Sequence, residues 1–137
     1  VPSWSQELMA QVTPMRDFLY GAEVAKNNAH FQFIFFGRDI VRALGSDPSG
    51  RIISPEAQTS PALEPLLTRL REGLKLVCHL KSPVHTFAKA PHQLPTGLYD
   101  GETLAVPFQY RGVDVGFILS ATILSPVGAD ADRRRIG

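Results

Sequence analysis

The residues that decide the fold are Phe31-Gln-Phe-Ile-Phe-Phe-Gly37-Arg-Asp-Ile-Val-Arg-Ala-Leu-Gly45-Ser-Asp47-Pro-Ser-Gly50-Arg51. The stretch opens with aromatic and β-branched residues, which favour a strand, and this strand stops at a glycine. A short apolar-periodic segment follows, and the stretch ends in a turn of the form Gly-x-Asp-x-Ser-Gly-Arg. It holds no nucleophile motif, metal cluster or phosphate loop, so it predicts an architecture rather than an active site.

The composition predicts a single soluble domain. The chain has 137 residues, of which 44% are hydrophobic and 20% charged, as is typical of globular proteins with one core. The net charge of +1 creates no field that would attract nucleic acid or an anionic membrane, so neither is expected as a partner. The basic run Arg133-Arg134-Arg135 is interpreted as part of a solvated tail.

Cysteine usage and hydropathy predict a cytoplasmic location. The one cysteine, Cys78, excludes an internal disulfide and fits a reducing compartment. No apolar run approaches the roughly 20 residues that a membrane helix needs. No signal-peptide pattern stands at the start of the sequence.

The N-terminal third predicts a helix followed by a β-hairpin. Trp4, Leu8 and Val12 recur at helical spacing over residues 3–12 and share one face, and Pro14 ends this helix. Residues 18–25 and 30–36 read as two antiparallel strands, joined by a tight turn at Asn27-Asn28 because asparagine tolerates positive φ.

Two helices are expected in the middle of the chain. Residues 38–44 allow two helical turns, between Gly37 and Gly45. Residues 61–72 predict a longer helix, with Pro61 in its first turn and Gly73 as its end. Its apolar face is formed by four leucines, namely Leu63, Leu66, Leu67 and Leu70.

After Gly73 the apolar period changes to two, which predicts strands. Leu76, Cys78 and Leu80 alternate with Lys75, Val77, His79 and Lys81, and residues 82–100 are proline-rich and read as a loop. Two longer strands are expected at 103–110 and 113–124, with a turn at Arg111-Gly112 between them. Pro107 lacks a backbone donor and requires an edge or bulge position. The chain thus divides into an N-terminal amphipathic cap helix (1–14), a domain (15–125) and a polar tail (126–137).

This order of elements resembles the PAS-domain family, and in particular small bacterial PAS proteins. The resemblance covers residues 18–124 and rests on the aromatic strand into Gly37, the Gly45-Ser-Asp-Pro-Ser-Gly-Arg51 turn and the C-terminal pair of strands. It implies an α+β fold with a five-stranded antiparallel sheet in the order 2-1-5-4-3. Helices would cover the inner face, with any ligand between, and the N-terminal helix would cover the outer face. It also implies a sensory or interaction module without catalysis.

The same resemblance argues against two cofactors. Flavin-adduct members carry a reactive cysteine in a short helix, and residues 38–60 contain none. Haem-binding members commonly place a histidine on the long helix, and residues 61–73 contain none. The cofactor therefore stays unknown. The Asp-Ile-Thr-like exit that couples many such domains to an effector is also absent, because the chain reads Ser125-Pro-Val-Gly.

Other groups with chemical potential are weighed against structural roles. His79, His85 and His92 lie near Cys78 in sequence, but their spacing fits no zinc pattern, and strand alternation would put Cys78 and His79 on opposite faces. No metal site is therefore expected, and Cys78 is interpreted as a small buried hydrophobe. Arg51 could bind a carboxylate, although a salt bridge that ties its loop to the sheet is the favoured interpretation.

The sequence therefore predicts a non-catalytic signalling module that binds a small ligand or a signalling protein partner. The ligand pocket is predicted on the inner face, at Phe33, Phe35, Leu66, Leu70, Cys78, Val106 and Phe117. A homodimer is predicted through the outer face and the N-terminal helix, with Trp4, Leu8 and Val12 at the interface.

Two alternatives remain open. One is a small-molecule enzyme on a related α+β fold, for which His79 or Tyr110 would be the first candidate groups. The other is a ligand-free structural dimerisation domain with a filled core.

Overall fold

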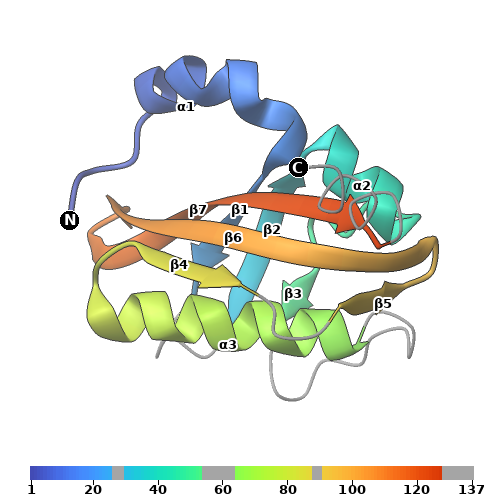
Figure 1. The fold of residues 1–137 in the computed structure, drawn as a ribbon. Coiled ribbons are helices and arrows are strands. Elements are labelled where there is room, and N and C mark those ends of the chain that lie inside the picture. The colour runs from blue at the N-terminus through green and yellow to red at the C-terminus, as the bar shows by residue number, and fades with distance from the viewer. Residues whose placement is uncertain (26–29, 54–63, 88–90, 128–137) are drawn as a thin grey trace.

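The computed structural model describes residues 1–25, 30–53, 64–87 and 91–127, which form one sheet with helices on both faces (Figure 1). All strand pairs of the sheet are antiparallel, and the strand order is β3-β2-β1-β7-β6-β4, with β5 paired to β6 off this path. The elements in chain order are α1 (Gln6–Val12), the 3-10 helix η1 (Thr13–Phe18), β1 (Leu19–Val24), β2 (Phe31–Phe36), α2 (Arg38–Leu44), β3 (Ile52–Ile53), α3 (Glu64–Leu80), β4 (Val84–Phe87), β5 (His92–Leu94), β6 (Gly97–Tyr110) and β7 (Val113–Pro126).

The sheet agrees with the predicted α+β class but not with every predicted strand. The predicted neighbours 2-1-5-4 are present as β2-β1-β7-β6. The third strand was predicted at residues 76–80, but these residues are helical, and β4 occupies that place in the sheet. The short strands β3 and β5 were not predicted. Figure 1 shows α1 on one face of the sheet, which we call the outer face, and α3 on the opposite, inner face.

The N-terminal helix is shorter than predicted. Ser5 caps α1, since its hydroxyl accepts a hydrogen bond from the Leu8 backbone N–H at 3.2 Å. Trp4 precedes the helix in an extended segment that bonds to the free edge of β6, where the Trp4 N–H donates to the Gln109 carbonyl at 2.8 Å. Pro107 lies on the same edge, beyond the last β4 pair at Ala105, which is the edge position that its missing N–H requires.

The predicted hairpin is confirmed and contains a bulge. Gly21 pairs with Phe35 and Ala22 pairs with Phe33, so Ile34 is an extra residue in β2. A bulge of this kind moves the following side chains to the other face. The predicted turn at Asn27-Asn28 lies outside the described residues.

The quoted glycine-rich segment folds as predicted. α2 occupies residues 38–44 and ends at Gly45 with φ 77°, a left-handed conformation that favours glycine. Asp47 Oδ1 accepts hydrogen bonds from the Ser49 hydroxyl at 2.5 Å and from the Ser49 N–H at 3.0 Å, and the two together hold the pKa of Asp47 below its ordinary value. The turn bonds to β2, since the Gly50 N–H donates to the Phe33 carbonyl and the Phe33 N–H donates to the Arg51 carbonyl.

The long helix does not end at Gly73, so the strand predicted over residues 76–80 is wrong. α3 continues to Leu80, and Lys81 then takes a positive φ of 53°. The helical period explains the extension, because Leu70, Leu74, Val77 and Cys78 continue one apolar face toward the sheet. Packing of this face offsets the cost of an interior glycine, which is about 1 kcal/mol.

The C-terminal hairpin is longer than predicted. β6 starts at Gly97, and the region predicted as a loop contains β4, β5 and this first part of β6. The turn at Arg111-Gly112 is confirmed, with φ of 51° and 76°. The polar tail predicted from residue 126 lies mostly outside the described residues, because β7 runs to Pro126.

The sheet separates two cores. The inner core packs α2 and α3 against the sheet and includes Tyr20, Phe31, Phe33, Phe36, Leu67, Leu74, Val77 and Ile118. The outer core consists of Leu19, Phe108, Phe117 and Leu119, with Trp4, Leu8, Val12, Phe35 and Tyr110 packed on it. Among the helices of the described residues, none has the length and apolarity that crossing a bilayer requires.

Candidate functional site

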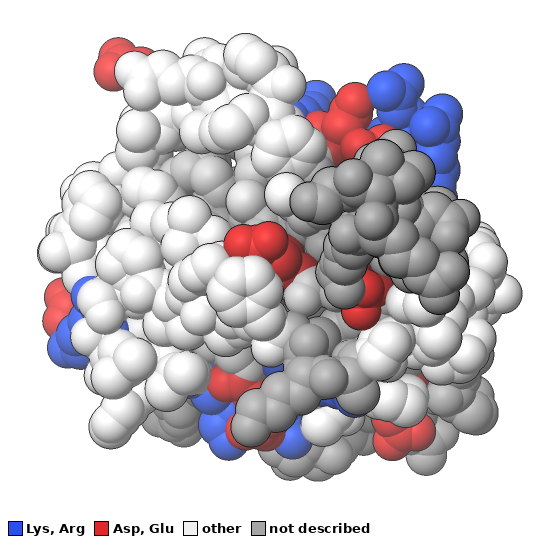
Figure 2. Space-filling model, viewed as in Figure 1, with Lys and Arg blue, Asp and Glu red and all other residues white. Residues whose placement is uncertain are grey.

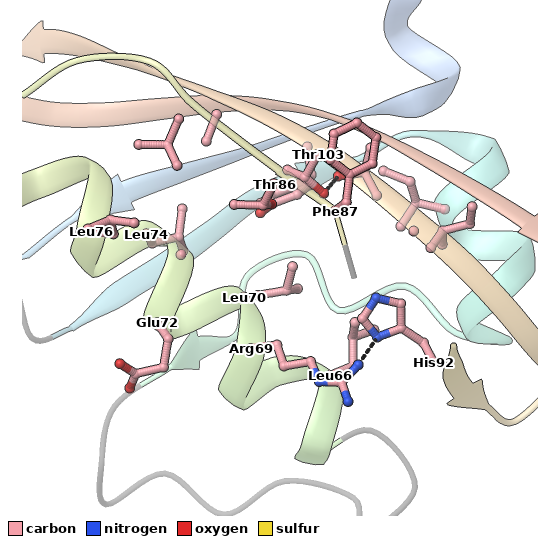
Figure 3. Close-up of a pocket in the computed structure, with 18 of the residues that line it drawn as sticks. Leu66, Arg69, Leu70, Glu72, Leu74, Leu76, Thr86, Phe87, His92 and Thr103 are labelled. Carbon is pink, nitrogen blue, oxygen red and sulfur yellow. Dashed lines mark hydrogen bonds between the residues drawn. The ribbon is translucent and has the colours of Figure 1, made fainter. Parts of the chain in front are cut away.

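A cavity of about 350 Å³ lies on the inner face, between α3, α2 and the strands β4, β6 and β7 (Figure 3). Its volume is near the lower limit of the roughly 300–1,000 Å³ range of small-molecule sites. The lining residues are Tyr20, Phe36, Ile40, Leu44, Leu66, Arg69, Leu70, Glu72, Gly73, Leu74, Leu76, Val84, Thr86, Phe87, His92, Gly101, Thr103, Ala105, Thr122 and Leu124.

Gly73 leaves part of this space open. It is an interior residue of α3, and a Cβ atom built on it would meet nothing within 4 Å. Gly73 is one of the lining residues, so a larger side chain at this position would reduce the free space at the cavity wall. The glycine that the sequence suggested as a helix end therefore contributes to a hollow.

The sheet wall of the cavity carries hydroxyl groups. The Thr103 and Thr122 hydroxyls, on β6 and β7, are hydrogen-bonded at 3.1 Å. Tyr20 is buried, and this burial raises the pKa of its hydroxyl to about 12, while the neighbouring Ser120 hydroxyl acts in the opposite direction. The tyrosine is therefore neutral at physiological pH and offers a polar but uncharged surface.

One end of the cavity is cationic. Arg69 extends from α3 to His92 on β5, and Arg69 Nη1 lies 2.8 Å from His92 Nδ1 (Figure 3). Because arginine only donates, Nδ1 must accept this bond, and a neutral ring then carries its proton on Nε2. Burial, and next the charge of Arg69, lower the pKa of His92, while Asp100 acts in the opposite direction.

A glycine in β6 makes room for the His92 ring. A Cβ atom on Gly101 would lie 2.8 Å from His92 Nε2 and 2.9 Å from its Cδ2. These distances are below van der Waals contact, so a larger residue at 101 would displace the ring. The position of His92 thus depends on both Arg69 and Gly101.

Two of the seven predicted pocket residues line this cavity, namely Leu66 and Leu70. Phe33 and Cys78 lie in the inner core but not at the cavity. The predicted inner-face position is wrong for the remaining three, because Phe35, Val106 and Phe117 pack in the outer core. Strict alternation failed at the bulge, which moves Phe35 to the outer face. For Val106 and Phe117 the predicted face was wrong, because Val106 shares the outer core with Phe108, the cross-strand partner of Phe117.

The sequence-based reading missed Arg69, Gly73 and His92. Arg69 and Gly73 follow Leu66 at spacings of three and seven residues, so the helical period of α3 was a signal that could have found them. His92 gave no such signal, because β5 is a strand of three residues within a segment read as loop.

The other sequence candidates lie away from the cavity. His79 is exposed on α3, so the long helix does hold a histidine, but one that does not line the cavity. Tyr110 packs on the outer core, with Arg111 over its ring at 5.0 Å. Arg51 is exposed and contacts β2 through its backbone.

Cys78 and the histidines do not form a cluster. Cys78 is buried in α3, and this burial raises the pKa of its thiol to about 11, so the thiol stays protonated. His85 lies on β4, where its Nε2 is 2.7 Å from the Glu102 carboxylate. Within the described part of the chain, no group of three or more His, Cys, Asp or Glu side chains is placed to hold a metal ion.

The predicted interface residues pack within the chain. Trp4, Leu8 and Val12 all contact the outer core and are partly buried there. The Trp4 ring stacks on Phe117 at 4.2 Å and meets the edge of Phe108 at 5.2 Å. The prediction that this helix covers the outer face is therefore consistent with the structure, whereas the dimer stays a prediction.

The fold and cavity define an α+β domain with a ligand-sized hollow between an antiparallel sheet and a long helix. No model of a known protein family matches the sequence, and a search of curated proteins finds no relative. Solved structures are similar. A LOV protein of Rhodobacter sphaeroides has a TM-score of 0.57 at 9% identity, with 96% of this chain and 74% of that chain covered.

Two further solved structures support the same assignment. A light-oxygen-voltage domain studied with a flavin analogue has a TM-score of 0.57 at 9% identity, covering 95% of this chain and 93% of that chain. The PAS domain of BvgS from Bordetella pertussis has a TM-score of 0.52 at 11% identity, covering 95% of each chain. The chain has the fold of PAS and LOV domains.

Proposed function

We propose that this chain is a non-catalytic PAS-fold sensory module that binds a small ligand in the inner cavity. The observation that carries the proposal is the cavity itself, with mostly apolar walls and one cationic end at Arg69. Small-molecule sites typically combine apolar walls with a few polar groups of this kind. The fold it shares with PAS and LOV domains supports the same function.

The signalling step would be a shift between two packings of helix and sheet. Phe36 lines the cavity, and its neighbour Phe35 packs on the outer core. A ligand that fills the cavity would favour one position of β2. A movement of β2 would shift Phe35 and so change the packing of the outer core. The ligand can shift the equilibrium only by the difference in its affinity for the two packings.

Native mass spectrometry and an absorption scan of the freshly purified chain test the ligand. We expect a bound small molecule, and the variant Gly73→Leu should lose it because the new side chain would occupy the cavity. Lys75→Gln, on the exposed part of α3, is the control and should keep it. If the protein carries no molecule and no compound in a small-molecule library raises its melting temperature, the ligand-free structural domain replaces this proposal.

A homodimer through the outer face is the second part of the proposal. Leu104 and Ile123 are exposed there on β6 and β7, and Leu104 pairs with Ala121, which contacts the outer core. On the side shown in Figure 2 most residues are uncharged, with acidic side chains near the centre and Lys and Arg toward the periphery. A second copy of the chain could cover this strip, and a signalling protein partner is the alternative occupant.

Light scattering of the full chain and of Leu104→Lys tests the dimer. We expect the full chain at twice the monomer mass and the variant at the monomer mass. Removal of residues 1–14 should also give the monomer, since α1 borders the same face. A full chain that stays monomeric at high concentration would contradict the dimer and leave the ligand site untouched.

The enzyme alternative receives no support from the cavity. His79 and Tyr110, its first candidates, do not line the cavity. His92 does, but its Nδ1 accepts a hydrogen bond from Arg69 rather than from the hydroxyl or thiol of a nucleophile.

A further inference from the structure

We propose that the ligand is an amphipathic carboxylate, with its apolar body between α3 and the sheet and its carboxylate at Arg69. This inference rests on the proposed function, because it requires a ligand in the inner cavity. It adds the chemical class of that ligand, which follows from how charge and apolar surface are distributed along the cavity.

Arg69 has hydrogen-bond donors to spare. A guanidinium carries five N–H donors and stays charged at all physiological pH values. The bond to His92 uses one side of it, at 2.8 Å. Within the described residues, no carboxylate forms an ion pair with Arg69. Its remaining donors can therefore bind a carboxylate in the bidentate geometry that suits arginine.

Nearby acidic groups do not cancel this charge. Glu72 belongs to the lining, but in Figure 3 its carboxylate points away from the sheet, and it lies 3.4 Å from Arg71. Asp100 acts on His92 more weakly than Arg69 does. A single arginine that forms no ion pair with a carboxylate of the described residues matches a monoanion.

The rest of the cavity suits an apolar body. Leu66, Leu70 and Leu74 face it from α3, and Leu124 faces it from β7. The Thr103 and Thr122 hydroxyls share one hydrogen bond, so at most one of their two O–H donors is left for a ligand. At about 350 Å³, the cavity is suited to a short aliphatic or a single-ring aromatic acid rather than a large cofactor.

Calorimetric titration of the full chain with octanoate and with octan-1-ol tests the assignment, since the two probes share a chain length and differ in the head group. We expect octanoate to bind about three- to fivefold more tightly, the gain expected of an ion pair with an exposed arginine. Arg69→Gln should remove this preference and leave the affinity for octan-1-ol within about twofold, because the apolar contacts stay. Lys75→Gln removes a charge from the same helix away from the cavity and should change neither affinity.

Each contrary result has a separate meaning. Equal affinity for the two probes, or a preference that survives Arg69→Gln, would overturn the carboxylate and leave a ligand-binding cavity in place. Octanoate binding that survives Gly73→Leu would place the acid outside the cavity and overturn the proposal. Failure of both probes would also overturn it, and the native mass measurement would then decide whether the cavity binds some other class of molecule.

Discussion

The two faces of this sheet are packed in different ways. On the outer face, aromatic rings fill the space under α1, with Trp4 stacked on Phe117 at 4.2 Å and Phe108 at its edge. On the inner face, leucines of the much longer helix α3 cover the sheet and leave a cavity of about 350 Å³. The larger helix thus gives the looser packing.

The difference lies on the helix side of each contact, because α3 presents leucines around Gly73 to the cavity, while Tyr20 and Phe36 line it from the sheet. Large planar rings fill a gap between a helix and a sheet more completely than leucines around a glycine. An unfilled cavity lowers stability, because its walls lose contacts. The cavity therefore lowers the stability that the inner face contributes, whereas the closely packed rings of the outer face raise stability.

The largest expected effect is on the outer face. Trp4→Ala removes the stack on Phe117 and should lower the free energy of unfolding by about 3 kcal/mol, the lower range for tryptophan truncation because the ring is only partly buried. Urea unfolding measures this loss. Met15→Ala, at an exposed position of η1, is the control and should change stability by less than about 0.5 kcal/mol. A loss below about 1 kcal/mol for Trp4→Ala would show that the outer core is not tightly packed.

One substitution, glycine to alanine, should have opposite signs on the two faces. On the outer face, a Cβ at Gly21 would lie 2.6 Å from Phe117 Cζ and 2.7 Å from Phe35 Cε1. These rings are held in the outer core, so Gly21→Ala should destabilise the fold by about 2 kcal/mol through overpacking. A neutral result in urea unfolding would contradict the tight packing assigned to this face.

On the inner face the same change should stabilise. Gly73→Ala adds a methyl group where nothing lies within 4 Å and removes a glycine from a helix interior, so a gain of about 0.5–1 kcal/mol is expected. Thermal and urea unfolding of this variant, compared with Gly21→Ala, measure the difference between the faces directly. A loss of stability at Gly73 would mean that the cavity is smaller than described.

The smallest effect concerns pH and the cationic end of the cavity. Unfolded His92 titrates near its ordinary pKa of about 6.5, whereas burial and Arg69 lower its pKa in the fold. Between the two values the unfolded chain binds more protons, so His92 contributes stability above about pH 6.5 that is lost as the pH falls.

Unfolding free energies at pH 7.5 and pH 5.5 test this prediction. Wild type should lose more stability between these values than His92→Gln does. Asp100→Asn should enlarge the loss, since Asp100 opposes the shift. Equal losses in wild type and His92→Gln would show that this histidine does not contribute.

The sequence was informative where local signals and packing agree. The stretch from Phe31 to Arg51 was predicted correctly because aromatic residues, two glycines and the Asp47 turn each favour the same local structure. Gly73 led to the wrong prediction that the long helix ends there. The free-energy cost of a glycine inside a helix is offset by the packing of Leu74 and Val77 in the inner core, which the sequence does not show.

The cavity was harder to predict than the fold. One extra residue, Ile34, reverses the alternation of β2. No glycine or other typical bulge residue in β2 indicates that the strand contains this bulge. The cationic end joins Arg69 and His92, which are 23 positions apart and come from a helix and a three-residue strand. Such pairs depend on tertiary geometry, so residue spacing alone could not identify them.

The stack of Trp4 on Phe117 has an optical consequence. Trp4 is the sole tryptophan of the chain, so tryptophan emission reports on the outer core alone. A ligand bound in the inner cavity would lie across the sheet from this ring. A change in emission intensity or wavelength on titration would therefore indicate that ligand binding on the inner face alters the packing of the outer core. Stopped-flow fluorescence would measure the rate of this change in the unlabelled protein.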